Sequence, residues 1–98
     1  MLKLVISPEA TADLDDIWSY IAEDNPEMAT LFLSSILAEC RLLSDSPYIG
    51  RERDDIQREG VRSIPFRNYI ILYQVKKDSV EILHVFHGRR DYPRLFDS

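Results

Sequence analysis

The chain has 98 residues, 45% of them apolar, which is enough for one modest core and a single domain spanning residues 1–98. Its net charge of −5 argues against sequence-specific or nonspecific binding to nucleic acid, because such binding usually needs a surplus of basic residues. The single cysteine, Cys40, excludes an internal disulfide and has no metal-ligand spacing around it, so we expect no metal and no other cofactor. The apolar start is too short for a signal sequence or a membrane anchor, and a cytoplasmic location is expected.

Charge is divided unevenly along the chain. Residues 1–47 hold nine acids and two bases, a net charge of −7, whereas residues 48–98 hold eight acids and ten bases, a net charge of +2. The acids Asp13, Asp15 and Asp16 are interpreted as a solvated helix face. Arginine predominates among the bases, and its planar fork suits bidentate recognition of carboxylates or phosphates. We therefore expect the second half to carry the function.

The first half reads as a strand followed by two helices. Apolar residues alternate with others over residues 2–6, which predicts a short strand. Ser7 is a good N-cap and Pro8 suits the first helical position, so a helix begins at Pro8. Asn25 and Pro26 repeat this pattern, ending the first helix and starting a second. Two helices joined so closely form an antiparallel hairpin.

The second half reads as a loop followed by three strands. The second helix ends near Ser44, and residues 48–60 are rich in charge, which predicts a surface loop. Residues 61–67, 69–75 and 80–87 have strand patterns and are joined by short turns, so they form an antiparallel meander. The order β-α-α-β-β-β predicts an α+β fold, with the helical hairpin packed on a largely antiparallel four-stranded sheet.

Arg62 poses a conflict within the first strand of this meander. It has the same strand parity as Ile64 and Phe66, whose side chains should face the helices. A bulge at Pro65 would switch the faces and relieve the conflict. Otherwise Arg62 lies on the helix-covered face near its end, where it is buried only with a charged partner.

Two histidines lie on the last predicted strand. The period of two places His84 on one face with Ile82 and Phe86, so we interpret it as a structural, hydrogen-bonded residue. His87 ends the strand next to Gly88 and two arginines. There it should be exposed and able to titrate near neutral pH.

Several segments together resemble one protein family. They are Ala12–Ala22, Asn25-Pro26, Pro47–Arg51, Val61–Ser63, Tyr69–Tyr73 and His87–Asp91. In this order they resemble the ParE/RelE superfamily of toxins from bacterial type II toxin-antitoxin pairs, and within it the ParE branch. The resemblance implies a βααβββ fold and a cognate ParD-like antitoxin that wraps the toxin and neutralises it.

The resemblance leaves three functions open. ParE-like members are associated with poisoning DNA gyrase, RelE-like members cleave ribosome-bound mRNA, and a non-toxic homologue would act only as an antitoxin-binding module. Metal-independent RNA cleavage needs a base, an acid and cations around the phosphate. The residues that could supply these groups are Glu52 or Glu59 as the base, Arg62 and Arg89 as phosphate clamps, and His87 or Tyr92 as the acid.

Gyrase inhibition by protein contact is favoured, because RelE-like nucleases resemble one another in a basic active face that this chain lacks. Such an inhibitor needs a complementary surface and no catalysis of its own. The residues that we expect to contact target or antitoxin are Arg62, Arg67, His87, Arg89, Arg90, Tyr92, Leu95 and Phe96. An antitoxin helix in a groove, or a strand added to the sheet edge, would fit this surface, and no membrane partner is expected.

Overall fold

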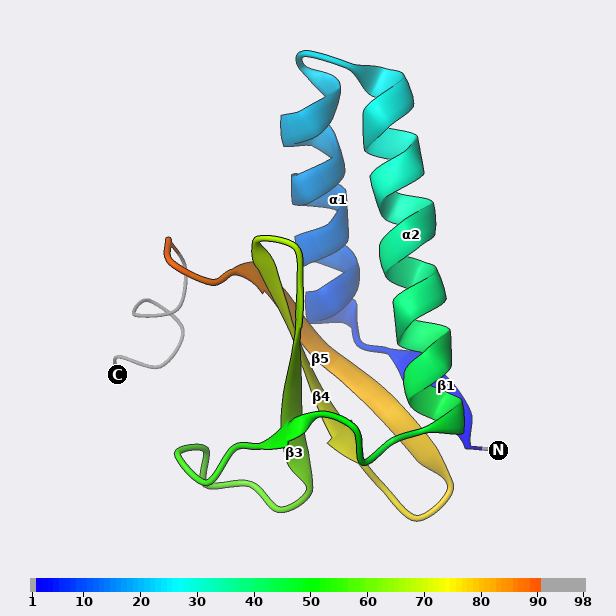
Figure 1. Ribbon diagram of the computed structural model, residues 1–98, viewed down its shortest axis with the longest axis vertical. Coiled ribbons are helices and arrows are strands. Elements are labelled where there is room, and N and C mark those ends of the chain that lie inside the picture. The colour runs from blue at the N-terminus through cyan, green and yellow to red at the C-terminus, as the bar shows by residue number, and fades with distance from the viewer. Residues whose placement is uncertain (1, 91–98) are drawn as a thin grey trace.

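The computed structural model describes residues 2–90 (Figure 1). The predicted contact residues Tyr92, Leu95 and Phe96 lie outside this range. The elements are β1 (Lys3–Ile6), α1 (Pro8–Ala22), α2 (Pro26–Asp45), β2 (Arg51–Glu52), β3 (Val61–Phe66), β4 (Tyr69–Val75) and β5 (Ser79–His87). Within the described residues, neither helix is long and apolar enough to cross a membrane.

Both helices begin where local chemistry predicts. The Ser7 side chain accepts a hydrogen bond from the Ala10 amide at 3.0 Å, and Asn25 accepts one from Met28 at 3.1 Å. A proline follows each cap at the first helical position. A good N-cap contributes about 1 kcal/mol, and the two caps together fix the start of each arm of the hairpin.

The sheet has five strands in the order β1-β5-β4-β3-β2, not the four that the sequence indicated. The additional strand, β2, forms inside the predicted charged loop and pairs Arg51 with Ser63 and Glu52 with Arg62. Two residues are too few to give a strand pattern, so this pairing was missed. The sheet is mixed: β1 runs parallel to β5 after the helical crossover, and the other pairs are antiparallel.

The helical hairpin covers one face of the sheet and extends past its end (Figure 1). The main core lies between these layers and includes Leu14, Ile36, Ile71, Tyr73 and Ile82. A second, smaller cluster lies on the opposite face, where Val61, Leu72 and Phe86 pack with partly buried side chains that include Ile56. The loop that carries Ile56 therefore covers part of the face that the helices leave open.

A β-bulge lies in β5, and the bulge considered at Pro65 is absent. The β3–β4 register runs without a shift through Pro65. Between β4 and β5, by contrast, Leu72 pairs with His84 while its neighbour Tyr73 pairs with Ile82. One β5 residue, Leu83, is therefore extra.

The bulge overturns the predicted faces of β5. Ile82 and Val85 both belong to the helix-side core, three residues apart, whereas Phe86 belongs to the cluster on the opposite face. The prediction that Ile82, His84 and Phe86 share one face is thus wrong. His84 and Phe86, after the bulge, lie on the opposite face from Ile82, before it. Strict alternation cannot reveal an inserted residue, because the insertion is set by the partner strand.

Asp13 ties α1 to the edge of β5 and is not merely solvated, which corrects the prediction. Its Oδ2 accepts the Val85 amide at 2.9 Å and lies 3.0 Å from His84 Nδ1. Ser7 Oγ donates to the Leu83 carbonyl nearby, at 3.0 Å. β1 pairs with β5 only as far as Ile82. Beyond that point the side chains of Ser7 and Asp13 form the hydrogen bonds with the β5 edge. The structural role predicted for His84 is confirmed.

Candidate protein-binding site

The strand register divides the predicted site residues between two ends of the sheet. Arg62 pairs with Tyr73, whereas Phe66, four residues further along β3, pairs with Tyr69, which pairs in turn with His87. Four residues of a strand span about 13 Å. Arg62 and the neighbouring Glu52 and Glu59 therefore lie at one end, and the remaining predicted residues lie at the other.

We call the second group the arginine end, defined as Arg67, His87, Arg89 and Arg90. Arg67 lies in the β3–β4 turn, and the other three lie at the end of β5 or directly after it. The Gly88 amide donates to the Asn68 carbonyl at 3.0 Å and so joins these two segments. The sheet thus brings together residues that are about twenty positions apart in the sequence.

An aromatic cluster packs against Arg67 and His87 of the arginine end. It consists of Phe32 on α2, Phe66 on β3 and Tyr69 on β4, with ring centroids 5.8 Å (Phe32–Phe66) and 5.3 Å (Phe32–Tyr69) apart. The Arg67 guanidinium carbon lies 5.5 Å from the Phe32 centroid and 5.1 Å from that of Phe66. The His87 ring meets Tyr69 edge to face at 5.6 Å. These contacts hold Arg67 and His87 in place at the surface.

Arg67 has an unusual backbone. Its φ is 56°, in the left-handed region that glycine favours. A non-glycine residue there costs on the order of 1 kcal/mol. The guanidinium is exposed over the aromatic cluster, and this contact offsets part of the cost.

His87 and the two following arginines complete the end. His87 is half-buried, which corrects the prediction that it is exposed, and its Nδ1 accepts the Arg90 amide at 3.2 Å. The Arg90 guanidinium lies 5.9 Å from the centroid of the exposed Tyr20 ring on α1. Arg89 is exposed and forms no ion pair or hydrogen bond with its side chain inside residues 2–90.

A hollow of about 290 Å³ adjoins this end, between α1 and the end of β5. Its walls include the carboxylates of Asp13 and Asp16, the rings of Tyr20 and Tyr69, and Arg90. Tyr20 and Phe32 were not predicted as site residues, because helical periodicity says nothing about which sheet end a helix approaches. The arginine end is thus an exposed cationic surface beside a hollow, with Arg67 and Arg90 lying against aromatic rings.

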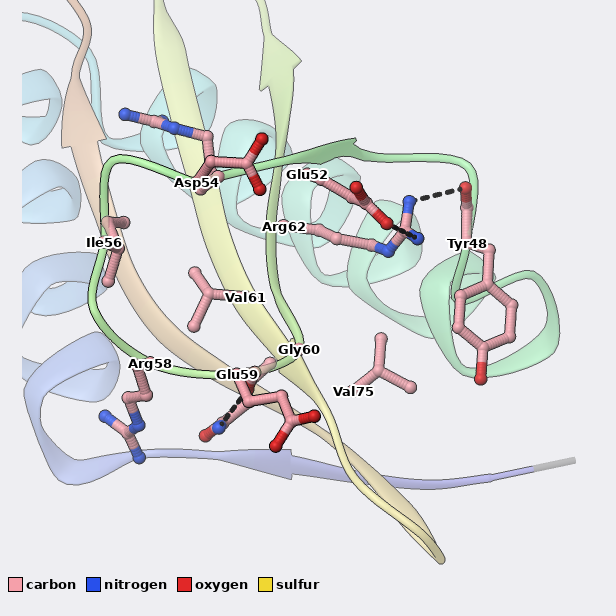
Figure 2. Close-up of a pocket in the computed structure, with 12 residues that line it drawn as sticks. Tyr48, Glu52, Asp54, Ile56, Arg58, Glu59, Gly60, Val61, Arg62 and Val75 are labelled. Atoms are coloured by element: carbon pink, nitrogen blue, oxygen red, sulfur yellow. Dashed lines mark hydrogen bonds and ion pairs between the residues drawn. The ribbon is translucent and has the colours of Figure 1, made fainter.

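At the opposite end of the sheet, Arg62 faces the helix side and has a charged partner. This is the arrangement expected if Pro65 forms no bulge. One terminal nitrogen, Nη1, donates to the carbonyls of Tyr48 at 3.2 Å and Gly50 at 2.7 Å, and the other, Nη2, donates to Glu52 at 3.0 Å. Figure 2 shows the contacts with Tyr48 and Glu52. The Tyr48 ring lies 5.1 Å from the guanidinium carbon. Arg62 is therefore placed to hold the segment before β2, with its side chain only 18% exposed.

Beside Arg62, the loop after β2 surrounds an open polar depression of about 830 Å³ (Figure 2). Glu52, Asp54, Arg58 and Glu59 line it. Arg53 anchors this loop to the sheet. It is 6% exposed, bonds both Asp55 carboxylate oxygens at 2.9 and 2.6 Å, and donates to Ser63 Oγ at 3.2 Å.

This geometry can be compared with known proteins. The family described as "ParE toxin of type II toxin-antitoxin system, parDE" matches residues 4–92 of this chain. The chain belongs to the ParE toxin family. It is 37% identical over 84 residues to the putative toxin Y4kP of Sinorhizobium fredii, covering 84% of this chain and 83% of that protein. It is 29% identical over 90 residues to Toxin ParE3 of Caulobacter vibrioides, covering 91% and 89%.

Solved structures give the same result for this ParE-family chain. A chain from the chromosomal ParDE TA system of P. aeruginosa superimposes with a TM-score of 0.74 at 26% identity, covering 89% of this chain and 96% of that one. The toxin-antitoxin complex RelBE2 of Mycobacterium tuberculosis matches in fold, with a TM-score of 0.63 at 23% identity over 88% and 96% of the two chains. The predicted α+β fold and the predicted membership of the ParE/RelE superfamily of type II toxins are confirmed.

Proposed function

We propose that this ParE-like toxin inhibits DNA gyrase by protein contact and that a cognate ParD-like antitoxin neutralises it. The observation that carries the proposal is the arginine end, where Arg67 lies over the rings of Phe32 and Phe66, Arg90 lies over Tyr20, and Arg89 is exposed. Arginine and tyrosine are enriched among the residues that dominate protein interfaces. An arginine held over a ring also loses less conformational entropy when a partner binds.

The alternative, an mRNA endoribonuclease, is less well supported by the geometry. A general base and a general acid must both reach one phosphodiester, within hydrogen-bond distance of the atoms they serve. Glu59 and Arg62 lie at one end of the sheet, whereas His87 and Arg89 lie at the other, about 13 Å away along the strands. Glu59, Arg62, His87 and Arg89 therefore do not surround one site.

The proposed antitoxin contact follows from charge and shape. An acidic antitoxin segment would meet Arg67, Arg89 and Arg90 on the surface next to the hollow. The tail residues Tyr92, Leu95 and Phe96 come two to six positions after Arg90 in the chain and remain part of the proposed contact. Target and antitoxin would compete for this surface, which accounts for neutralisation.

Purified protein should be tested for gyrase inhibition, with accumulation of cleaved DNA, and in parallel for mRNA cleavage in a translation reaction. We expect loss of supercoiling activity and intact mRNA. Cleaved mRNA with unaffected gyrase would establish the ribonuclease alternative and refute the proposal.

The placement of the contact is tested by Arg89→Ala/Arg90→Ala. We expect at least about tenfold weaker antitoxin binding, equivalent to about 1.4 kcal/mol, because charge-assisted contacts are lost. The matched control is Lys76→Ala/Lys77→Ala, which removes the same charge from the β4–β5 turn at the far end. Unchanged toxicity and unchanged antitoxin affinity in the arginine variant would show that the contact lies elsewhere.

A further inference from the structure

The turn Pro47–Gly50 displays two large apolar side chains outside the core. Tyr48 is 67% exposed and Ile49 is 58% exposed. Surface turns usually carry glycine, proline and small polar residues, whose backbone preferences or hydrogen bonds favour the turn. Tyr48 and Ile49 offer neither advantage, and with more than half of each residue in solvent they add little to the hydrophobic core.

The backbone of this turn is nevertheless held firmly from inside the fold. The buried Tyr73 hydroxyl donates to the Pro47 carbonyl at 2.8 Å and accepts the Gly50 amide at 2.9 Å. Arg62 donates to the carbonyls of Tyr48 and Gly50. Side chains from two neighbouring strands thus satisfy four backbone groups of one four-residue turn.

Close packing at Gly50 keeps this arrangement tight. A Cβ atom there would lie 2.9 Å from the Ser63 carbonyl oxygen and would overlap the Tyr73 hydroxyl. The Tyr48 ring is further restrained by the Arg62 guanidinium beside it, at the edge of the depression (Figure 2). A side chain that is already restrained costs less to bind, since ordering a free one costs about 0.5–1.5 kcal/mol.

We propose that Tyr48 and Ile49 are anchor residues that insert into an apolar pocket of the inhibited protein, and that Arg62 and Tyr73 position them. The inference rests on the proposed function, because the occupant to which it commits is DNA gyrase. The pocket would have apolar walls for both side chains and a polar group for the Tyr48 hydroxyl.

Shape and position favour the target over the antitoxin as the occupant. The two side chains project outward, so the partner must supply a cavity, which a folded protein has and a single helix or strand lying on a surface does not. The turn also adjoins Arg62, at the opposite end of the sheet from the proposed antitoxin contact. Gyrase would therefore contact the turn in addition to the surface for which it competes with the antitoxin.

The test compares Tyr48→Ala/Ile49→Ala with Met28→Ala/Leu31→Ala, a control pair of similarly exposed apolar residues on α2. Supercoiling by purified gyrase and affinity for the antitoxin are measured for both, with thermal unfolding to verify folding. We expect the turn variant to need at least about tenfold more protein for half-inhibition of gyrase, with antitoxin affinity unchanged. The control should match the wild type in both.

Each contrary result has a distinct meaning. If wild-type protein inhibits gyrase and the folded turn variant inhibits it equally well, the anchor role is wrong. An equal loss of antitoxin affinity would make the antitoxin the occupant and overturn the assignment to gyrase. If wild-type protein does not inhibit gyrase at all, the proposed function fails and this inference fails with it.

The positioning role has its own test. Arg62→Lys keeps the charge but loses the planar fork, in which Nη1 bonds the two turn carbonyls while Nη2 bonds Glu52. We expect it to weaken gyrase inhibition severalfold in the otherwise wild-type protein and to have no further effect once Tyr48 and Ile49 are alanine, because there is then nothing to position. Equal effects in both backgrounds would show that Arg62 acts independently of the turn.

Discussion

Arg67 combines a strained backbone with an exposed side chain. Its φ of 56° is costly for a residue with a side chain, yet its guanidinium lies over the rings of Phe32 and Phe66. The sequence could not reveal this, because Asn68 was the residue that suited the turn and Arg67 was assigned to the strand. A left-handed arginine depends on tertiary contacts, which local propensity does not include.

Substitutions at Arg67 should separate the backbone cost from the side-chain contact. Arg67→Ala loses the ring contacts and keeps the strained φ, whereas Arg67→Gly loses the same contacts but relieves the strain. We expect the glycine variant to be more stable than the alanine variant by about 1 kcal/mol in urea unfolding. Both should bind antitoxin less tightly than the wild type. Equal stabilities would mean that the turn relaxes when the arginine is removed.

Cys40 should make stability decrease at alkaline pH. Burial raises the pKa of its thiol from 9.0 to about 11, and the neighbouring Glu39 adds to this effect. The thiol therefore contributes fully below pH 9, and the contribution is lost as pH rises from 9 to about 11, because the unfolded chain releases the proton first.

Cys40→Ala should remove this pH dependence between pH 9 and 10, while lowering stability at pH 7 because a buried side chain is truncated. Urea unfolding at a series of pH values provides the measurement. Above pH 10, Tyr73 adds a similar effect, since burial also raises its pKa. An identical decline in wild type and variant up to pH 10 would exclude Cys40 as the cause.

Elements with a clear local sequence pattern could be predicted, whereas features that depend on pairing with another strand could not. Capping residues followed by proline gave both helix starts, and apolar runs gave β3, β4 and β5. The short strand β2 and the bulge in β5 depend on partners 9 to 12 residues away in the sequence. The helix-side position of Arg62 could be stated only as an alternative, because it depended on whether Pro65 formed a bulge.

The connection between α1 and β5 should depend on Asp13. Asp13→Ala leaves the Val85 amide and His84 without their acceptor, at a cost of about 1–3 kcal/mol in the free energy of unfolding. Asp15→Ala is the matched control, because Asp15 is exposed on the same helix, and we expect a change within about 0.5 kcal/mol. Chemical denaturation compares the two, and equal losses would show that the Asp13 contacts do not stabilise the fold.

The sheet separates the residues predicted from the sequence as one contact surface into two groups. Arg67, His87, Arg89 and Arg90 do converge, as predicted from their clustering, whereas Arg62 lies at the far end and supports the Tyr48 turn. The sequence could not show this division, since it follows from strand register and not from charge. The exposure of Tyr48 and Ile49 could not be predicted either, because large apolar residues are expected in a core.

Growth of bacteria that express the protein without its antitoxin tests whether this ParE-family chain is an active toxin. We predict growth arrest with accumulated cleaved plasmid DNA, and recovery when the antitoxin is co-expressed. Normal growth, with soluble and folded protein present in the cells, would contradict the proposed inhibition of gyrase and would favour a non-toxic binding module.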